Sequence, residues 1–318
     1  LGQMLYINGF SMIDRVEMVT DDGEVFTHSW DAIADTAAIS PSGEVSIDDV
    51  AYKVSEMDVT PSPLLSEDLY SILDIAPTIA YALGLPELPQ AEGTVRITST
   101  GNWEQAVMIF LDGLQYEKLE SLISEGKLPF IGKLDPRRAG VTVYPPITNA
   151  ASAALLTSSP PQMNGVFGYG YRTTESTTLF DLAAGNGLRV EAVEGYAVPF
   201  NLRNAEITLS GDTEKNGYTN DNVLANSLEI IQPDMPDLMY IHFHDIDDMG
   251  HTYGPQSAEY TQAIITVDGY LAEIYDALPE GTFVAIFADH GMHATTDGGN
   301  HGTLQSLDML IPIIFLDK

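Results

Sequence analysis

Residues 106–113 read Ala-Val-Met-Ile-Phe-Leu-Asp-Gly, six apolar residues followed by an acid and a glycine. A continuous apolar run of this length is typical of a strand that is buried on both faces of a parallel sheet. Residues 238–244 and 282–288 have the same form, and acids and histidines lie at or directly after their ends. Because ligands bind at the carboxyl ends of parallel strands, we expect these polar residues to meet at one edge of the sheet.

A helix is predicted between the second and third of these strands. Apolar residues over 257–277 recur at helical spacing, so this segment is expected to cover one face of the sheet. Strands that alternate with helices predict an α/β fold, here a three-layer α/β/α sandwich with a mostly parallel central sheet. We expect residues 105–318 to form its core and residues 1–318 to form a single α/β domain.

The first hundred residues do not follow this pattern of alternating apolar strands and helices. Residues 1–60 form a mixed, acidic N-terminal segment with strand-like pieces at Met4–Ile7 and Glu24–Thr27. Residues 67–83 have the pattern of a helix whose first turn contains two acids, Glu67–Asp68. For the N-terminal segment the sequence gives no positive sign of a separate role.

The chain has 318 residues and 13 Lys and Arg against 46 Asp and Glu, a formal charge of −33. Binding to nucleic-acid polymers or anionic membranes requires a basic surface, so this composition argues against both partners. The hydrophobic fraction of 44% is sufficient for a large core. Cysteine is absent, which excludes disulfides, thiolate metal sites and cysteine nucleophiles.

No membrane span is predicted from the sequence. Apolar runs such as Met309–Leu316 are far shorter than the roughly 18 to 20 residues that a bilayer requires. Residue 1 is Leu, which a processed or trimmed chain would show, so the localisation stays open between the cytoplasm and export with a targeting segment removed. The sequence does not indicate an oligomeric state.

Six of the seven histidines lie between positions 242 and 301, together with acids that follow predicted strands. Asp247 and His251 are four residues apart, Asp289 and His290 are adjacent, and His301 follows in a glycine-rich loop. Carboxylates and imidazoles without sulfur suit Zn²⁺, with Mn²⁺ as the alternative. The ligands exceed what one four-coordinate ion needs, so we predict two divalent ions, an arrangement that typically serves phosphoryl displacement.

The motifs of this region, taken in order, resemble the alkaline phosphatase superfamily, and most closely its type I phosphodiesterase/nucleotide pyrophosphatase branch. The matching pieces are Phe110–Gly113, Gly126–Pro129 with Tyr144–Ala150, Asp247–Pro255, Ala288–Met292 and Asn300–Thr303. Together they extend over about residues 105–318. The resemblance implies an alkaline phosphatase-like fold and a hydrolase that cleaves a small phosphodiester or nucleotide pyrophosphate.

The resemblance also implies a role for individual residues. The family's positions for one metal are occupied by Asp112, Thr148, Asp289 and His290, and those for the other by Asp247, His251 and His301. Thr148 takes the place of the nucleophile, which forms a covalent phosphothreonine. Thr148 also precedes the apolar run 150–156, so it fits a helix N-cap, and a helix N-terminus favours an anionic phosphate.

Three residues are predicted to contact the substrate: Asn149, Tyr169 and His293. The pair Thr148-Asn149 resembles the phosphonoacetate hydrolase pattern, so a phosphonate hydrolase or a phosphomonoesterase is the alternative activity. Tyr169 stands where relatives carry an Asn that hydrogen-bonds the phosphoryl oxygen. A metal-binding pseudoenzyme with little or no turnover is a further alternative, motivated by Tyr169 and by the order of the segments.

His242 and His244 share one face of the predicted strand 238–244. We interpret both as packing residues or residues at the edge of the site rather than as metal ligands.

The segment 60–95 contains a run, residues 71–84, that resembles a helix which relatives carry near their C-terminus. In this chain the run precedes the first motif, which suggests a circular permutation. Such a rearrangement is physically possible because the termini of a domain often lie close together at its surface. It predicts that residues 60–95 pack against the same sheet as residues 105–318.

Overall fold

The computed structural model describes residues 1–7, 11–63, 69–98 and 103–318 and contains a central sheet of eight strands. In spatial order the strands are β11 (Glu206–Leu209), β10 (Val190–Glu194), β12 (Leu238–Phe243), β8 (Gln105–Leu111), β13 (Thr282–Phe287), β16 (Leu310–Asp317), β9 (Arg137–Val141) and β7 (Tyr70–Ser71). Neighbouring strands are parallel except at β16, which is antiparallel to β13 and β9. The prediction of a mostly parallel sheet is confirmed.

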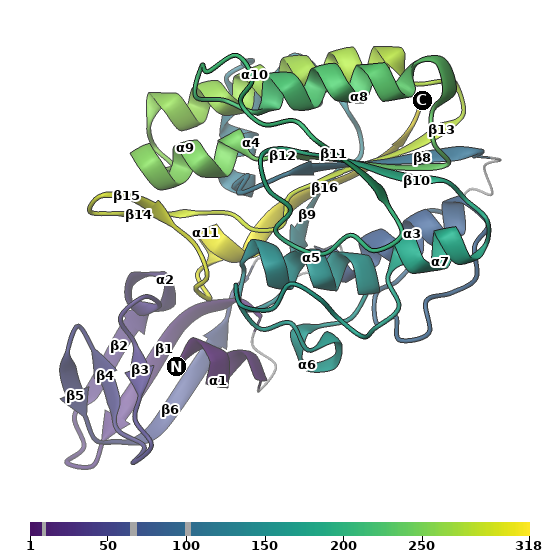
Figure 1. The fold of residues 1–318 in the computed structure, drawn as a ribbon. Helices are drawn as coiled ribbons and strands as arrows, with labels where there is room; N and C mark the ends of the chain where they lie inside the picture. Colours follow the sequence, from purple (N-terminus) through teal and green to yellow (C-terminus); the bar gives the residue numbers. More distant parts are fainter. Residues whose placement is uncertain (8–10, 64–68, 99–102) are drawn as a thin grey trace.

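Helices cover both faces of this sheet (Figure 1). One face carries α4 (Tyr116–Ser124), α8 (Asn220–Asp234), α9 (Asp245–Tyr253) and α10 (Ala258–Ala277), and the other carries α3 (Ile75–Ala82), α5 (Thr148–Thr157), α6 (Pro161–Asn164) and α7 (Leu179–Gly185). The three-layer α/β/α class is therefore confirmed, and α10 spans the helix predicted over 257–277. In the described part of the chain, no helix has the length and apolar character needed to cross a membrane.

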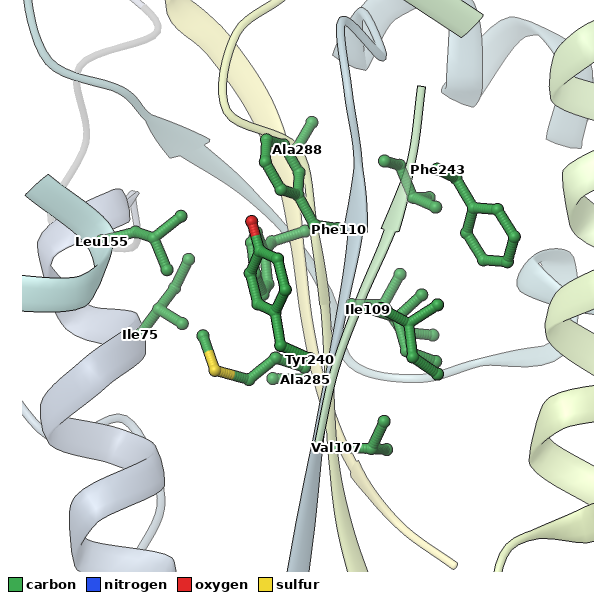
Figure 2. Close-up of a cluster of buried hydrophobic side chains, with 14 of the residues drawn as sticks. Ile75, Val107, Ile109, Phe110, Leu155, Tyr240, Phe243, Ala285 and Ala288 are labelled. Atoms are coloured by element: carbon green, nitrogen blue, oxygen red, sulfur yellow. The ribbon is translucent and has the colours of Figure 1, made fainter. Parts of the chain in front are cut away.

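The strands at the centre of the sheet are apolar on both sides because both sides are covered. Figure 2 shows Phe110 and Tyr240 on the face that meets α3 and α5, whereas Ile109 and Phe243 point toward the opposite layer. Residues 106–111 are all at most 1% exposed. A strand in this position has no solvent-facing side, which explains why its sequence is a continuous apolar run rather than an alternating one.

The N-terminal segment forms two small antiparallel sheets beside the main domain. Its elements are α1 (Gly2–Ile7), β1 (Ile13–Thr20), β2 (Val25–Ser29), α2 (Trp30–Ile33), β3 (Ala38–Ile39), β4 (Val45–Ile47), β5 (Val50–Tyr52) and β6 (Val54–Pro61). Trp30 is fully buried, and its indole Nε1 donates a hydrogen bond to the Leu304 carbonyl at 3.1 Å. The segment therefore packs against the chain that leads into β16.

The strand-like pattern at Met4–Ile7 is not realised, because these residues belong to helix α1. Leu5 is buried, and Met4 and Tyr6 pack against the same apolar cluster as Trp30. A short apolar run fits either a strand or a helix, so the packing partner rather than the local pattern decides its conformation.

Residues 70–82 join or pack against the same sheet as the core. β7 pairs in parallel with β9, and α3 packs against α5 and β13. The helix begins at Ile75, after a 3-10 turn over Ile72–Asp74, and not at residue 67; Glu67–Asp68 lies outside the described residues. A capping box between Ser71 and Asp74 marks the start of the 3-10 turn at Ile72. The packing is what a circular permutation requires, and the permutation itself stays a prediction.

Candidate active site

The predicted metal-binding residues meet at the carboxyl ends of β8, β12 and β13. Asp112 directly follows β8, Asp289 and His290 follow β13, and Asp247 lies in α9, which follows β12. His251 also lies in α9, and His301 follows the hairpin of β14 (His293–Thr295) and β15 (Gly298–Asn300). Possible ligand atoms of Asp112, Asp289 and His290 lie within 4.8 Å of one another, and so do those of Asp247, His290 and His301.

Three buried carboxylate oxygens in this cluster accept no hydrogen bond from any described residue: Asp112 Oδ1, Asp247 Oδ1 and Asp289 Oδ2. The other oxygen of Asp289 accepts hydrogen bonds from the backbone N–H groups of Gly113 and His290, at 3.2 and 2.9 Å. A buried carboxylate oxygen without a donor is costly unless a cation neutralises it. The three orphaned oxygens therefore fit divalent metal ions.

The three predicted histidine ligands share one tautomer. Each has its Nδ1 within hydrogen-bond distance of a backbone carbonyl oxygen, and a carbonyl only accepts, so Nδ1 carries the hydrogen. The pairs are His251 with Gly299 at 3.1 Å, His290 with Gly291 at 3.0 Å and His301 with Pro146 at 2.9 Å. This leaves Nε2 of each ring free to bind a metal, which is the usual arrangement of histidine ligands.

Asp247, His251 and His301 form the second half of the cluster. His251 Nε2 lies 3.2 Å from Asp247 Oδ2 and 3.1 Å from His301 Nε2. Gly113 adopts a φ of +69°, and a Cβ at this position would lie 2.6 Å from Asp247 Oδ1. Only glycine allows β8 to turn here while Asp247 approaches the backbone so closely.

Thr148 is the first residue of α5, and its side-chain Oγ1 lies 3.4 Å from His290 Nε2. The N-cap position belongs to Ile147, so the sequence placed the helix start one residue too late. The first N–H groups of a helix have no partner within it, and they favour a bound anion. The Thr148 hydroxyl therefore lies where a phosphate group would meet both the helix end and the candidate metal ligands.

Asn149 and Tyr169 differ in their access to the site. The Asn149 amide donates hydrogen bonds to the backbone carbonyls of Tyr171 and Pro199, at 3.1 and 2.8 Å, so both donors are used within the protein. Tyr169 is 58% exposed, and its hydroxyl lies 3.5 Å from His301 Nε2. Of the two, Tyr169 is the residue whose polar group lies beside a predicted metal ligand.

His293 is buried away from the other histidines of the cluster. Its Nδ1 lies 2.8 Å from Asp308 Oδ1, and its Nε2 lies 2.9 Å from Asp35 Oδ2 in the N-terminal segment. Burial lowers the pKa of His293, but the hydrogen bond and charge of Asp308, together with Asp35, raise it overall. His293 thus links the N-terminal segment to the main domain, and contact with the substrate stays a prediction.

The carboxyl groups of the cluster have strongly perturbed pKa values. Burial, with the charges of Asp289 and Asp247, raises the pKa of Asp112 well above its ordinary value. Burial and the Asp247 charge raise the pKa of Asp289 to about 6. Burial also opposes ionisation of Asp247, but a hydrogen bond with His251 and the charges of His290 and His301 lower its pKa overall.

The pKa values of the three histidines also shift in different directions. A hydrogen bond with Asp247 raises the pKa of His251 to about 9. Burial lowers the pKa of His290 to about 4, and burial and the neighbouring His290 lower the pKa of His301 to about 4. At neutral pH, His290 and His301 are therefore already in the form that binds a metal, whereas His251 must first lose a proton.

Affinity for Zn²⁺ should consequently fall as the pH falls. In the metal-free protein His251 carries a proton below about pH 9 and Asp289 carries one below about pH 6, and the cation must displace both. We expect affinity to fall about tenfold per pH unit between pH 8 and 6.5 and more steeply below pH 6. Calorimetric titrations in buffers of different ionisation enthalpy measure the protons released. An affinity independent of pH over this range would contradict the assignment of these ligands.

Two further buried histidines, His242 and His244, lie beside Asp112, and the buried Glu194 contacts both of them. The sequence predicted none of the three as ligands. Possible ligand atoms of Asp112, His242 and His244 lie within 4.8 Å of one another. Glu194 is the last residue of β10, in the strand next to β12. An acid at the carboxyl end of a predicted strand is the signal that identified Asp112. Glu194 has the same position in β10, a strand that was not predicted from the sequence.

Comparison with protein families supports the resemblance seen in the motifs. Residues 187–310 match the family model described as type I phosphodiesterase / nucleotide pyrophosphatase. The predicted resemblance is confirmed. The matched region begins before β10 and includes the two strands β12 and β13, all of α9, and His301. It therefore contains five of the predicted metal ligands and lies after Asp112 and Thr148.

Two curated relatives align with parts of the chain. GPI ethanolamine phosphate transferase 3 of Eremothecium gossypii is 36% identical over 94 residues, which are 29% of this chain and 9% of that protein. Phosphopentomutase of Herpetosiphon aurantiacus is 32% identical over 130 residues, which are 41% of this chain and 31% of that protein. The chain thus spans less than a third of the length of either relative.

A solved structure supports the fold alone. The 2-O GAG sulfatase BT1596 superimposes with a TM-score of 0.51 at 14% identity, over 68% of this chain and 64% of that one. The similarity agrees with the α/β/α architecture and carries no information about substrate.

Proposed function

We propose that the chain is a metal-dependent hydrolase that cleaves a small phosphodiester or nucleotide pyrophosphate through a covalent phosphothreonine at Thr148. The observation that carries the proposal is the position of the Thr148 hydroxyl. It lies at the N-terminus of the buried helix α5, 3.4 Å from His290 Nε2 and beside carboxylates with orphaned oxygens. In the rest of this cluster the side chains are acids and histidines suited to bind metal, so Thr148 is the residue suited to attack phosphorus.

The metal-binding roles follow the two halves of the cluster. One ion would be held by Asp112, Thr148, Asp289 and His290, and the other by Asp247, His251 and His301. Two bound divalent ions, Zn²⁺ or Mn²⁺, would supply Lewis acidity that lowers the pKa of the Thr148 hydroxyl and offsets charge on the phosphoryl oxygens.

The chain's own residues account for the covalent chemistry. Thr148 Oγ1 bonds to phosphorus as the bond to the first leaving oxygen breaks, and the threonine ester is hydrolysed when water attacks from the position that the leaving group vacated. The free N–H groups at the start of α5 point toward the phosphoryl group and stabilise its charge. His290 and His301 stack at 3.6 Å between ring centroids, which fixes the rings that face the reacting oxygen.

Tyr169 is proposed to replace the asparagine of the relatives as a donor to the phosphoryl oxygen. Burial, with the charges of Asp247, Asp289 and Asp112, raises the pKa of its phenol, so the hydroxyl keeps its hydrogen at neutral pH. A lost donor to a developing oxyanion costs about 3 kcal/mol, so Tyr169→Phe should lower kcat/KM about 100-fold. Tyr169→Asn should retain more activity, and both variants should keep the metal content of the native protein. Equal kcat/KM for Tyr169→Phe and native protein would exclude the role.

The relatives support the class of substrate. The names GPI ethanolamine phosphate transferase and phosphopentomutase both refer to a phosphate group on an organic molecule. The acidic surface, with a charge of −33, disfavours nucleic-acid polymers but not a small ester that metal ions bind in a buried site.

A panel of four substrates tests the proposed activity: an aryl phosphodiester, a nucleotide pyrophosphate, an aryl phosphomonoester and phosphonoacetate. The highest kcat/KM is expected for the diester or the pyrophosphate. The highest value for phosphonoacetate or the monoester would replace the proposed substrate class with the alternative that the sequence suggested. Bound metal without turnover of any of the four would instead indicate a pseudoenzyme.

A further inference from the structure

The N-terminal segment contacts the chain that follows His301, residues 302–309, which we call the His301 loop. The Trp30 indole donates its hydrogen bond to the carbonyl of Leu304, three residues after His301. Asp31 accepts hydrogen bonds from the backbone N–H of Ser306, at 3.0 Å, and from the Ser306 hydroxyl. Two adjacent residues of α2 therefore hold three polar groups of the His301 loop.

A second connection runs from Asp35 through His293 to the same loop. Asp35 Oδ2 lies 2.9 Å from His293 Nε2, and Asp308 Oδ1 lies 2.8 Å from Nδ1 of that ring. The other oxygen of Asp308 accepts hydrogen bonds from the backbone N–H and the hydroxyl of Thr303, at 2.9 and 2.8 Å. Asp308 is fully buried, where the loss of a hydrogen-bond partner is costly. Thr303, two residues after His301, is thereby tied to the N-terminal segment.

Apolar packing surrounds these polar contacts. Leu304 and Met309 of the His301 loop belong to the same buried cluster as Trp30 and Ile33 of α2. The four side chains are between 0% and 4% exposed. Movement of the N-terminal segment away from the loop would expose them to water, which is unfavourable.

The N-terminal segment also contacts the chain that holds the His301 ring from the other side. His301 Nδ1 lies 2.9 Å from the carbonyl oxygen of Pro146. Two residues before Pro146, the ring of Tyr144 packs against Tyr6 of α1, with centroids 5.6 Å apart. Helix α1 thus contacts the chain that leads to Thr148, and α2 contacts the chain that follows His301. Contacts on both sides restrict the position of His301 Nε2.

We propose that Trp30, Asp31 and Asp35 are positioning residues for His301, which they orient by holding the His301 loop against the N-terminal segment. The inference rests on the proposed two-metal centre, in which His301 binds one of the ions. A metal-bound imidazole has to present its nitrogen within a narrow range of positions, and groups that orient a ligand without touching the metal typically change its affinity 10- to 100-fold. The N-terminal segment, for which the sequence gives no role, is on this view part of the metal site.

Docking of the N-terminal segment and binding of the ion at His301 should therefore be coupled. If the docked segment raises the affinity for this ion by some factor, the ion stabilises the docked segment by the same factor. The ion proposed beside Thr148 should depend less on the segment, because Asp112 and Asp289 directly follow the central strands β8 and β13.

The test measures the Zn²⁺ affinity of each bound ion in the full chain by competition with a chromophoric chelator. Asp31→Ala should weaken one ion about 10- to 100-fold and leave any other close to its native affinity. Asp31→Asn keeps an oxygen that can accept the Ser306 N–H, so it should recover most of the lost affinity. A role in general stability alone would lower the melting temperature without this selective change.

Two further variants identify the affected ion and control for the loss of an acid. His301→Ala should remove the same ion, and adding Asp31→Ala to it should cause no further loss of affinity for the ions that remain. Glu17→Ala is the matched control, since it removes an exposed acid of the same segment whose carboxylate contacts Thr27 within that segment. It should keep every affinity of the native protein.

Native affinity for every ion in Asp31→Ala would overturn the inference and leave the two-metal centre standing, whereas a native protein that binds no ion would overturn both. Equal weakening of all ions would show a general effect on the fold and would also reject the positioning role. Should Asp31→Ala fail to fold, amide hydrogen exchange of the native protein and His301→Ala decides the question. Zn²⁺ should slow exchange in residues 30–37 and 302–309 of the native protein but not of His301→Ala, and equal slowing in both would reject the coupling.

Discussion

Replacing Thr148 with alanine is expected to lower kcat for an aryl phosphodiester by about 10,000-fold or more, because it removes the attacking oxygen. The side chain is 8% exposed and contributes one hydroxyl at the start of α5, so its loss should leave the fold intact. Steady-state hydrolysis, with metal content and thermal unfolding measured on the same samples, checks the prediction.

Two further variants separate chemistry from packing. Thr148→Ser keeps the oxygen and should keep a substantial part of the activity. Thr157→Ala removes a buried hydroxyl at the other end of α5, where it donates to the Ala153 carbonyl, and should change stability more than kcat. Retained activity in Thr148→Ala, with native metal content, would show that another group attacks phosphorus.

Removing the metal ions should abolish hydrolysis and also lower the stability of the protein. Without cations, the buried oxygens Asp112 Oδ1, Asp247 Oδ1 and Asp289 Oδ2 accept no hydrogen bond from the described residues. A ligand at 1,000 times its dissociation constant contributes about 4 kcal/mol to stability, so chelation should shift the melting temperature by several degrees or more. Melting curves and activity, before and after addition of a chelator and again after Zn²⁺ is restored, measure both effects.

The loss of stability on chelation should be larger at pH 7.5 than at pH 5. The folded metal-free protein raises the pKa of Asp289 to about 6, above its value in the unfolded chain. At pH 5 the cation must displace this proton as well as the one on His251, whose pKa is about 9, so Zn²⁺ binds less tightly and contributes less stability than at pH 7.5. A chelator saturated beforehand with Zn²⁺ serves as the control and should have no effect. Unchanged melting and full activity after complete metal removal would contradict the metal-dependent mechanism.

The central strands and the long helix were predictable because their signals are local. Burial on both faces makes β8, β12 and β13 continuous apolar runs, and α10 repeats apolar residues with helical spacing. Helix α1 was not predictable in the same way, since its six residues fit a strand as well and their packing partners lie elsewhere in the chain. The 3-10 turn that precedes α3 begins at a capping box between Ser71 and Asp74, which the acidic pattern did not indicate.

The residues of the candidate site were likewise predictable only where their signal is local in the sequence. The motifs around Asp112, Asp247 and Asp289 are short and follow strands, so the sequence indicated their neighbourhood. Glu194 lies 48 residues from His242, and the two meet only because β10 pairs with β12. No local pattern contains that pairing, which is why the contact between Glu194 and His242 emerged only from the structure.

The most direct test of the account is to locate the covalent intermediate. Enzyme mixed with excess aryl phosphodiester is quenched in acid during the first turnover, digested and analysed by tandem mass spectrometry. The account predicts a phosphoryl adduct on the peptide that contains Thr148, assigned to the threonine oxygen and absent from Thr148→Ala. An adduct on another residue, or turnover with no adduct at any quench time, would contradict it.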